Sequence, residues 1–130
     1  MNTRALLPVL TGLAIVGMSA ASSTAFAAPD AAAGKKIYIR CMACHTIQPG
    51  GPNKVGPNLS GVVGRKAAQV KGFRYSAAMQ KANVTWNEAT LDKWLMRPAS
   101  VVPGTSMAFA GLSKPEDRAA VIAYLKKPAP

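Results

Sequence analysis

Cysteine and histidine are scarce in this chain, and the shortage excludes several kinds of site. The 130 residues include two Cys and one His. A structural zinc site normally takes four such ligands, so the chain has too few for one. Credible strands are lacking as well, which argues against the α/β fold that carries thioredoxin-type dithiols. The helical spacing of apolar residues predicts an all-α fold instead.

Acidic side chains are the second shortage. Five Asp and Glu residues stand against sixteen Lys and Arg, which gives a formal net charge of +11. A positive field of this size favours acidic partners. Nucleic acid is a possible target of any basic chain, but the N-terminal sequence argues against that partner.

The N-terminal residues have the pattern of an export signal. Arg4 supplies a basic start, residues 5–18 form an apolar run, and Ala25-Phe26-Ala27 is a cleavage site. An uncleaved membrane anchor is the alternative, although the apolar core is shorter than about 18 residues. We therefore expect residues 1–27 to be removed, and residues 28–130 to form a single domain in the periplasm, away from nucleic acid.

The two cysteines and the histidine stand together in the pentad Cys41-Met42-Ala43-Cys44-His45. This C-x-x-C-H order is the pattern of covalent haem attachment, in which each thiol adds to one porphyrin vinyl group and the histidine ligates the iron. A disulfide across so short a loop would restrict little chain entropy. An exposed redox dithiol remains the alternative.

The opposite face of the iron decides between two kinds of function. An open face can bind gases or peroxide, whereas a closed face limits the protein to passing electrons. With the only histidine used, methionine and lysine are the candidate ligands. Met79 and Met96 fall in expected helices, where methionine usually fills core gaps. Met107 lies in a Pro-Gly turn and is the favoured ligand, and a His/Met pair would raise the reduction potential.

The rest of the chain predicts helices at both ends with long loops between them. Pro29 and Asp30 are placed to start a helix, and the amphipathic spacing of residues 34–41 should lead this helix into Cys41. Residues 46–72 are rich in Gly, Pro and Asn, so something other than secondary structure must order them, and a large flat cofactor would do so. The other expected elements are a short helix capped by Ser76, a helix that follows a Thr85–Glu88 capping box and ends at Pro98, and a last helix that follows a Ser113–Glu116 capping box.

Further motifs stand in a fixed order between Gly34 and Lys127. They are Gly34-Lys35-Lys36-Ile37-Tyr38, the Cys41–His45 pentad, Val55-Gly56-Pro57-Asn58-Leu59, Gly64-Arg65-Lys66, Gly72-Phe73-Arg74-Tyr75, Thr85-Trp86, Pro103-Gly104-Thr105-Ser106-Met107, Phe109-Ala110-Gly111 and Ile122-Ala123-Tyr124-Leu125. Through this ordered set the chain resembles a class I cytochrome c of the mitochondrial and bacterial c2 type. The resemblance implies a fold in which the N- and C-terminal helices cross, and helices and long loops enclose the haem.

The resemblance also implies what individual residues do. Cys41 and Cys44 would form the thioethers, and His45 and Met107 would be the axial iron ligands. The carbonyl of Pro57 would accept a hydrogen bond from the other nitrogen of His45, which fixes the ring.

Three further residues match positions that bind the haem propionates in this family. They are Arg65, Tyr75 and Trp86. Buried carboxylates need charge and hydrogen-bond donors, and these side chains supply both. Each could otherwise be a surface arginine or a core aromatic residue.

The chain departs from the mitochondrial proteins at several positions. Trp94 replaces a tyrosine whose hydroxyl bonds the methionine sulfur, and Met79 replaces a polar residue near the propionates. Ala99, Ser100 and Ser106 replace lysines around the exposed haem edge. The basic residues left as docking candidates are Arg40, Lys54, Lys71 and Lys114.

Together these features predict a soluble, exported electron carrier with one covalently attached haem c, and not an enzyme. We expect a monomer whose acidic redox partners, such as an oxidase, a reaction centre, a dehydrogenase or a bc1-type complex, make transient contact at the membrane. The alternative is a haem c sensor or peroxidase-like enzyme with an open sixth iron position.

Overall fold

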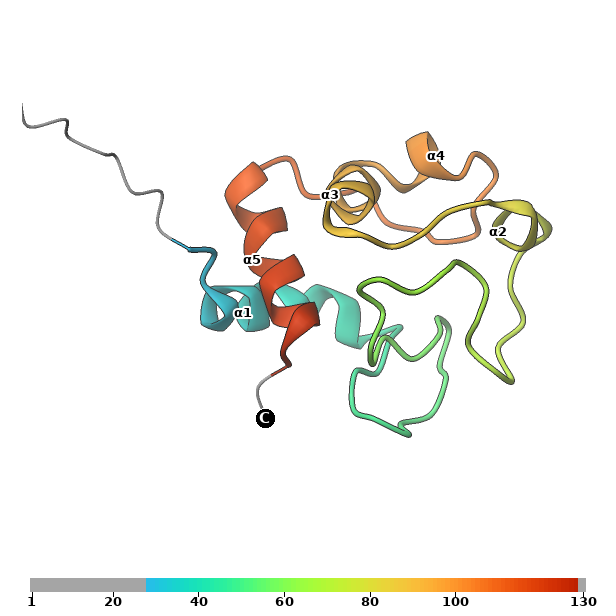
Figure 1. Cartoon of the computed structure of the whole chain (residues 1–130), viewed down its shortest axis with the longest axis horizontal. Helices are drawn as coiled ribbons and strands as arrows, with labels where there is room; N and C mark the ends of the chain where they lie inside the picture. The colour runs from blue at the N-terminus through green and yellow to red at the C-terminus, as the bar shows by residue number, and fades with distance from the viewer. Residues whose placement is uncertain (1–27, 129–130) are drawn as a thin grey trace, which may run out of the picture.

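The structure is a computed structural model, and it describes residues 28–128. The expected signal peptide, residues 1–27, lies outside the described residues. The helices are α1 (Ala31–Met42), α2 (Ala77–Lys81), α3 (Glu88–Met96), α4 (Pro98–Val101) and α5 (Pro115–Lys126). Long irregular segments join them (Figure 1). In the described part of the chain, extended pairing is limited to one isolated bridge between Lys66 and Thr85, so the all-α prediction is confirmed.

Helix α1 begins directly after Asp30, at the start that the sequence pattern predicted. Asp30 caps it, because its Oδ1 atom accepts a hydrogen bond from the backbone nitrogen of Ala32 at 2.8 Å. Three alanines before Gly34 are good helix formers and extend the first turn. The helix ends at Met42, so Cys41 is helical and Cys44 follows the last turn.

The first and last helices cross at close range (Figure 1). A Cβ atom on Gly34 would lie 2.0 Å from the carbonyl oxygen of Ala120 in α5, which only a glycine permits. The rings of Tyr38 and Tyr124 pack at a centroid distance of 5.2 Å on the same interface. The expected crossing of the terminal helices is therefore confirmed, and it explains the glycine inside α1.

The predicted caps are right for one inner helix and wrong for two others. Ser76 caps α2 as expected, since its hydroxyl accepts from the nitrogen of Met79 at 3.2 Å. Helix α3 is capped by Asn87 through the nitrogen of Thr90 at 2.9 Å, and not by Thr85. Ser113 is not a cap either: α5 starts at Pro115, which needs no partner for a backbone N–H.

A short helix that the sequence did not predict follows α3. Pro98 ends the α3 run as expected, but it also occupies the first turn of α4. Proline is favourable there because its fixed φ suits a first helical turn. Arg97 between the two helices is extended, with φ −160°.

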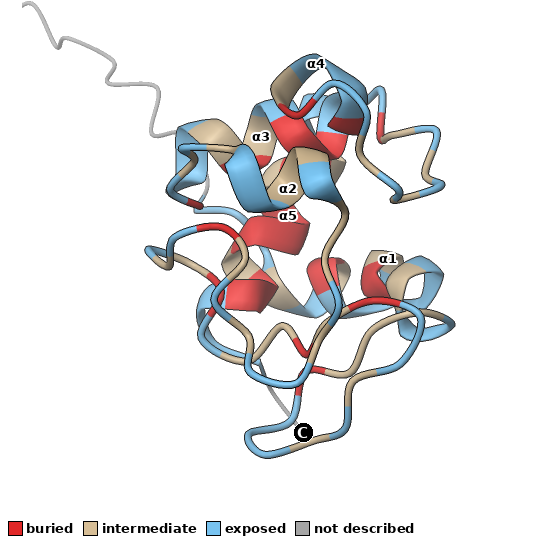
Figure 2. Ribbon diagram, turned by 90° about the vertical axis from the view of Figure 1, so that its right-hand side faces the viewer, coloured by how far each residue is buried: buried red, intermediate tan, exposed pale blue. Residues whose placement is uncertain are grey.

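The core joins α1, α3 and α5. Its buried hydrophobic residues are Tyr38, Ile47, Val62, Ala67, Trp86, Leu91, Trp94, Leu95, Val102, Leu112, Ala120, Val121, Ile122, Tyr124 and Leu125. Helix α5 carries much of this buried surface (Figure 2). Trp86 and Trp94 pack with ring centroids 5.0 Å apart. Met96 is 47% exposed, so its expected role as a core filler is wrong.

Asn58 helps to order the loop that follows the cysteine pentad, in addition to the cofactor that the sequence predicts there. Its amide donates to the hydroxyl of Thr46 at 2.7 Å and to the carbonyl of Gln48 at 2.9 Å. Its Oδ1 atom accepts from the nitrogen of Ser60 at 2.9 Å. These bonds add to the backbone hydrogen bonds of this stretch, such as that from the nitrogen of Leu59 to the carbonyl of Thr46 at 2.8 Å. No helix in the described residues has the length and apolarity needed to cross a membrane.

Candidate functional site

A cavity of about 250 Å³ opens between the helices and the long loops. Most of its walls are apolar, and include Leu59, Phe73, Leu91 and Val121. All eight of the predicted site residues line it: Cys41, Cys44, His45, Pro57, Arg65, Tyr75, Trp86 and Met107. The fold therefore brings residues from three distant parts of the sequence to one place.

The imidazole of His45 is fixed on one wall of this cavity. Its Nδ1 atom lies 2.7 Å from the carbonyl oxygen of Pro57. Since a carbonyl only accepts, Nδ1 carries the proton and the lone pair of Nε2 is left for a metal. Burial lowers the pKa of His45, Lys54 adds to that effect, and the hydrogen bond to Pro57 partly opposes it. The ring is therefore neutral at pH 7, as an iron ligand must be.

Gly56 lies directly against this ring, a role that the sequence motif did not reveal. A Cβ atom at this position would lie 2.3 Å from Cε1 of His45. The nitrogen of Gly56 also donates to the carbonyl of Cys44 at 2.8 Å, which ties the loop back to the pentad. Any larger residue would push the imidazole out of its place.

Both thiols are free and lie beside the imidazole. Cys41 and Cys44 are each partly buried, and both line the cavity. Burial raises the pKa of Cys41, the neighbouring Cys44 adds to the increase, and Arg40 opposes it. A partly buried thiol with a raised pKa is a poor redox dithiol, because the reactive form is an accessible thiolate. The geometry thus disfavours the alternative that the pentad alone had left open.

Two methionines reach the cavity. Met107 enters from the loop between α4 and α5, and Met79 enters from α2. Both are partly buried against the core. Met96, the third sequence candidate, does not line the cavity.

The polar residues of the cavity wall keep donors available. Arg65 donates to the carbonyls of Ser60 at 2.8 Å and Asn58 at 3.3 Å, and a guanidinium has five N–H groups in total. The hydroxyl of Tyr75 accepts from the nitrogen of Val70 at 3.2 Å, so its own proton can still be donated. Apolar walls, two thiols, a neutral imidazole and these donors fit a covalently bound haem with its carboxylates.

One residue on the wall carried no sequence signal. Ala68 lines the cavity with a φ of 57°, the left-handed region that glycine prefers. An alanine in a sequence does not indicate a left-handed backbone conformation, so only the structure shows it.

Comparisons with known proteins agree with this geometry. A family model described as cytochrome c matches residues 31–128. The cytochrome c2 of Rhodomicrobium vannielii is 47% identical over 114 residues, which cover 87% of this chain and 91% of that protein. The cytochrome c of Chlamydomonas reinhardtii is 50% identical over 101 residues, or 77% of this chain and 90% of the other.

A solved structure gives the same result. The cytochrome cH from Methylobacterium extorquens superimposes with a TM-score of 0.71 at 47% identity, and the match covers 75% of this chain and 97% of that one. With this fold, these relatives and a thiol pair beside a neutral imidazole, the chain belongs to the cytochrome c family, as an electron carrier that binds haem c covalently and not as an enzyme.

Proposed function

We propose that this chain is an exported electron carrier in which His45 and Met107 hold the two axial positions of the haem iron. The observation that carries the proposal is that one cavity receives the fixed imidazole of His45 and a methionine from a separate loop. Between the two methionines that reach the cavity, Met107 is favoured because its loop is free of helical geometry. Met79 is held within α2.

A neutral imidazole and a soft thioether suit an electron carrier. A thioether stabilises ferrous iron, so a His/Met pair raises the reduction potential relative to two histidines. Both positions being taken, small molecules would find no open site on the iron. The carbonyl of Pro57 would fix the His45 ring by accepting a hydrogen bond from it, and the apolar walls would exclude water.

The propionates would lie at the polar part of the cavity wall. Arg65 supplies charge, and Tyr75 and Trp86 supply an O–H and an N–H donor. Arg65 is itself anchored by two loop carbonyls, so its remaining donors are oriented before a carboxylate arrives.

The chain would work as a monomer in the periplasm after removal of residues 1–27. Its positive charge suits acidic redox partners, whether an oxidase, a reaction centre, a dehydrogenase or a bc1-type complex. A mass that corresponds to a haem-bearing chain starting at Ala28 would support both the cleavage and the attachment.

The axial ligand is tested by replacing each cavity methionine in turn. We expect ferrous Met107→Ala to bind carbon monoxide readily at neutral pH, because its sixth position is open. The visible spectrum should lose the signature of sulfur ligation, and the reduction potential should fall.

Met79→Leu is the matched control, since it removes the other sulfur from the same cavity with little change in volume. This variant should resist carbon monoxide as the unmodified protein does. Rapid binding by the unmodified ferrous protein would instead support the sensor or peroxidase-like alternative.

A further inference from the structure

The loop that carries Met107 packs partly against the core but makes few hydrogen bonds to the helices. The nitrogen of Met107 donates to the hydroxyl of Thr105 at 3.2 Å, and its carbonyl accepts from the nitrogen of Phe109 at 3.1 Å. Both partners belong to the same loop, so these bonds shape it without fixing it to the helices. The position of Met107 therefore depends on how the ends of the loop are anchored.

The C-terminal end of the loop is anchored first against α3. The nitrogen of Leu112 donates to the carbonyl of Leu95 at 2.7 Å. A Cβ atom on Gly111 would lie 2.0 Å from the carbonyl oxygen of Met96, so the chain passes directly against the end of this helix. Leu112 itself is buried in the core.

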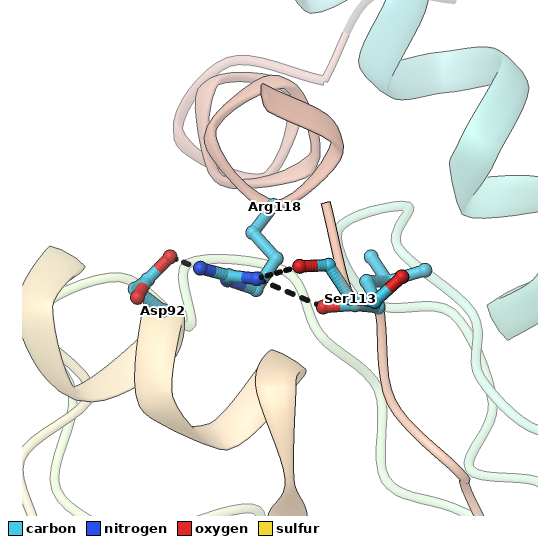
Figure 3. Close-up of polar contacts among 4 residues, drawn as sticks. Asp92, Ser113 and Arg118 are labelled. Atoms are coloured by element: carbon cyan, nitrogen blue, oxygen red, sulfur yellow. Dashed lines mark hydrogen bonds and ion pairs between the residues drawn. The ribbon is translucent and has the colours of Figure 1, made fainter. Parts of the chain in front are cut away.

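Arg118 of α5 also holds this end of the loop, and its guanidinium lies between Asp92 of α3 and Ser113 (Figure 3). One of its nitrogens, Nη1, donates to the carbonyls of Leu112 and Ser113, each at 2.9 Å. Its Nε atom donates to Oδ1 of Asp92 in α3 at 2.7 Å. The Arg118 side chain is 7% exposed, whereas that of Asp92 is 44% exposed. A buried guanidinium thus joins α3, α5 and the end of the loop.

We propose that Arg118 is a positioning residue for Met107: by holding the carbonyls of Leu112 and Ser113, it keeps the ligand loop closed over the cavity. The inference rests on the proposed His45/Met107 ligation. A lysine would not replace it, because the planar fork of arginine directs two N–H groups at fixed angles. Loss of a charge-assisted hydrogen bond to the loop would raise the population in which Met107 is detached.

A second ion pair offers a comparison that separates this role from simple helix pairing. Glu88 lies one turn before Asp92 on α3 and pairs with Lys126 of α5 at 2.6 Å. Both pairs therefore tie α3 to α5. In the described part of the chain, only the pair formed by Arg118 also carries hydrogen bonds to the loop.

Imidazole binding to the haem-loaded ferric protein measures the detached population directly. An external ligand binds only when Met107 has left the iron, so its apparent dissociation constant is inversely proportional to the open fraction. We expect Arg118→Lys to lower this constant by about tenfold or more. Asp92→Asn should lower it by a smaller factor, and Glu88→Gln should leave it unchanged.

Each variant is also checked for helix content by circular dichroism and for the ferric absorption band of methionine ligation. If Arg118→Lys fails to fold, the comparison of Asp92→Asn with Glu88→Gln decides the matter. Equal imidazole constants in those two variants, or a lower melting temperature in Arg118→Lys without a change in imidazole binding, would overturn the inference. Absence of the methionine band in the unmodified protein would instead overturn the proposed ligation itself.

Discussion

Tyr38 places a hydroxyl inside the interface between the first and last helices. The residue is 2% exposed, and its hydroxyl has no hydrogen-bond partner among the described residues. Burial raises the pKa of this phenol well above its ordinary value of 10.0, and Cys41 and Tyr124 add to the increase. The fold therefore holds Tyr38 in its neutral form, at some cost in unsatisfied hydrogen bonding.

Replacing Tyr38 by phenylalanine should change the response of stability to alkaline pH. The stabilisation from the raised pKa is complete below pH 10 and is lost as the pH rises further, because the unfolded chain then releases the proton more easily. The free energy of unfolding of the unmodified protein should thus fall above pH 10 by up to about 1.4 kcal/mol per pH unit more than that of Tyr38→Phe. Denaturant titrations from pH 7 to 11 measure this difference.

The matched comparison is Tyr75→Phe at pH 7. The hydroxyl of Tyr75 accepts a bond from Val70, so its removal should cost about 1 kcal/mol, whereas Tyr38→Phe should be neutral or stabilising. A loss of the same size in Tyr38→Phe would mean that its hydroxyl has a partner.

Ala68 adopts a backbone conformation that is unfavourable for alanine. A non-glycine residue in the left-handed region costs about 1–2 kcal/mol, and Ala68→Gly removes this cost. Part of the resulting gain in stability is offset, because glycine has greater freedom in the unfolded chain. We expect this variant to raise the free energy of unfolding by about 0.5–1 kcal/mol, measured by denaturant titration.

Ala67→Gly provides the neighbouring control. Ala67 is buried and its nitrogen donates to the carbonyl of Val84 at 2.9 Å, so glycine there brings only a loss of packing and greater unfolded-state freedom. That variant should be destabilised, and similar effects from both substitutions would contradict the assignment of strain to Ala68.

At the scale of elements, the crossing of α1 and α5 frames one side of the haem cavity. Gly34 contacts the backbone of Ala120, which has no flexible side chain that could move aside. Gly34→Ala should therefore lower the free energy of unfolding by at least about 1–3 kcal/mol through overpacking. The change is read from denaturant unfolding followed by circular dichroism.

Lys36→Ala is the control within the same helix, because Lys36 is exposed. It should change stability by less than about 0.5 kcal/mol. If Gly34→Ala proved as stable as this control, the close approach of the two helices would be wrong.

The helix ends show where the local sequence predicts a cap correctly and where it does not. Asp30 and Ser76 cap the helices that the pattern assigned to them. Thr85 also fits a capping pattern, but it pairs with Lys66 in an extended bridge, and the nitrogen of Trp86 donates to the carbonyl of Arg65 at 2.9 Å. The helix can start only after this pairing ends. Contacts with a distant loop thus override a valid local signal.

At the scale of the whole molecule, charge is unevenly distributed along the chain. Residues 31–87 include no Asp or Glu, yet they carry nine Lys and Arg. They form α1, α2 and the long loops, and several of them line the haem cavity. The two ion pairs of α3 and α5 neutralise acidic residues elsewhere. The charged residues that line the cavity are therefore all basic: Arg40, Arg65 and Lys66.

This distribution predicts salt-sensitive electron transfer. The second-order rate constant with an acidic redox partner should fall severalfold between about 0.01 M and 0.1 M salt, as the Debye length shortens from about 30 Å to about 10 Å. Stopped-flow measurements of haem oxidation give the rate. Reduction by an uncharged small molecule is the control and should not depend on salt, and a salt-independent rate with the protein partner would exclude electrostatic docking.

Chemistry that is local in the sequence could be predicted from it. The pentad that ends at His45 carries the thiols and the ligand within five residues, the spacing of apolar residues marks the helices, and the net charge is a simple sum. What depends on contacts between distant segments was decided by tertiary structure. Packing of Gly56 sets the His45 ring, Asn58 orders a loop, and Arg118 joins a loop to two helices. No local pattern encodes these contacts, because each partner lies where the folded chain, and not the sequence, places it.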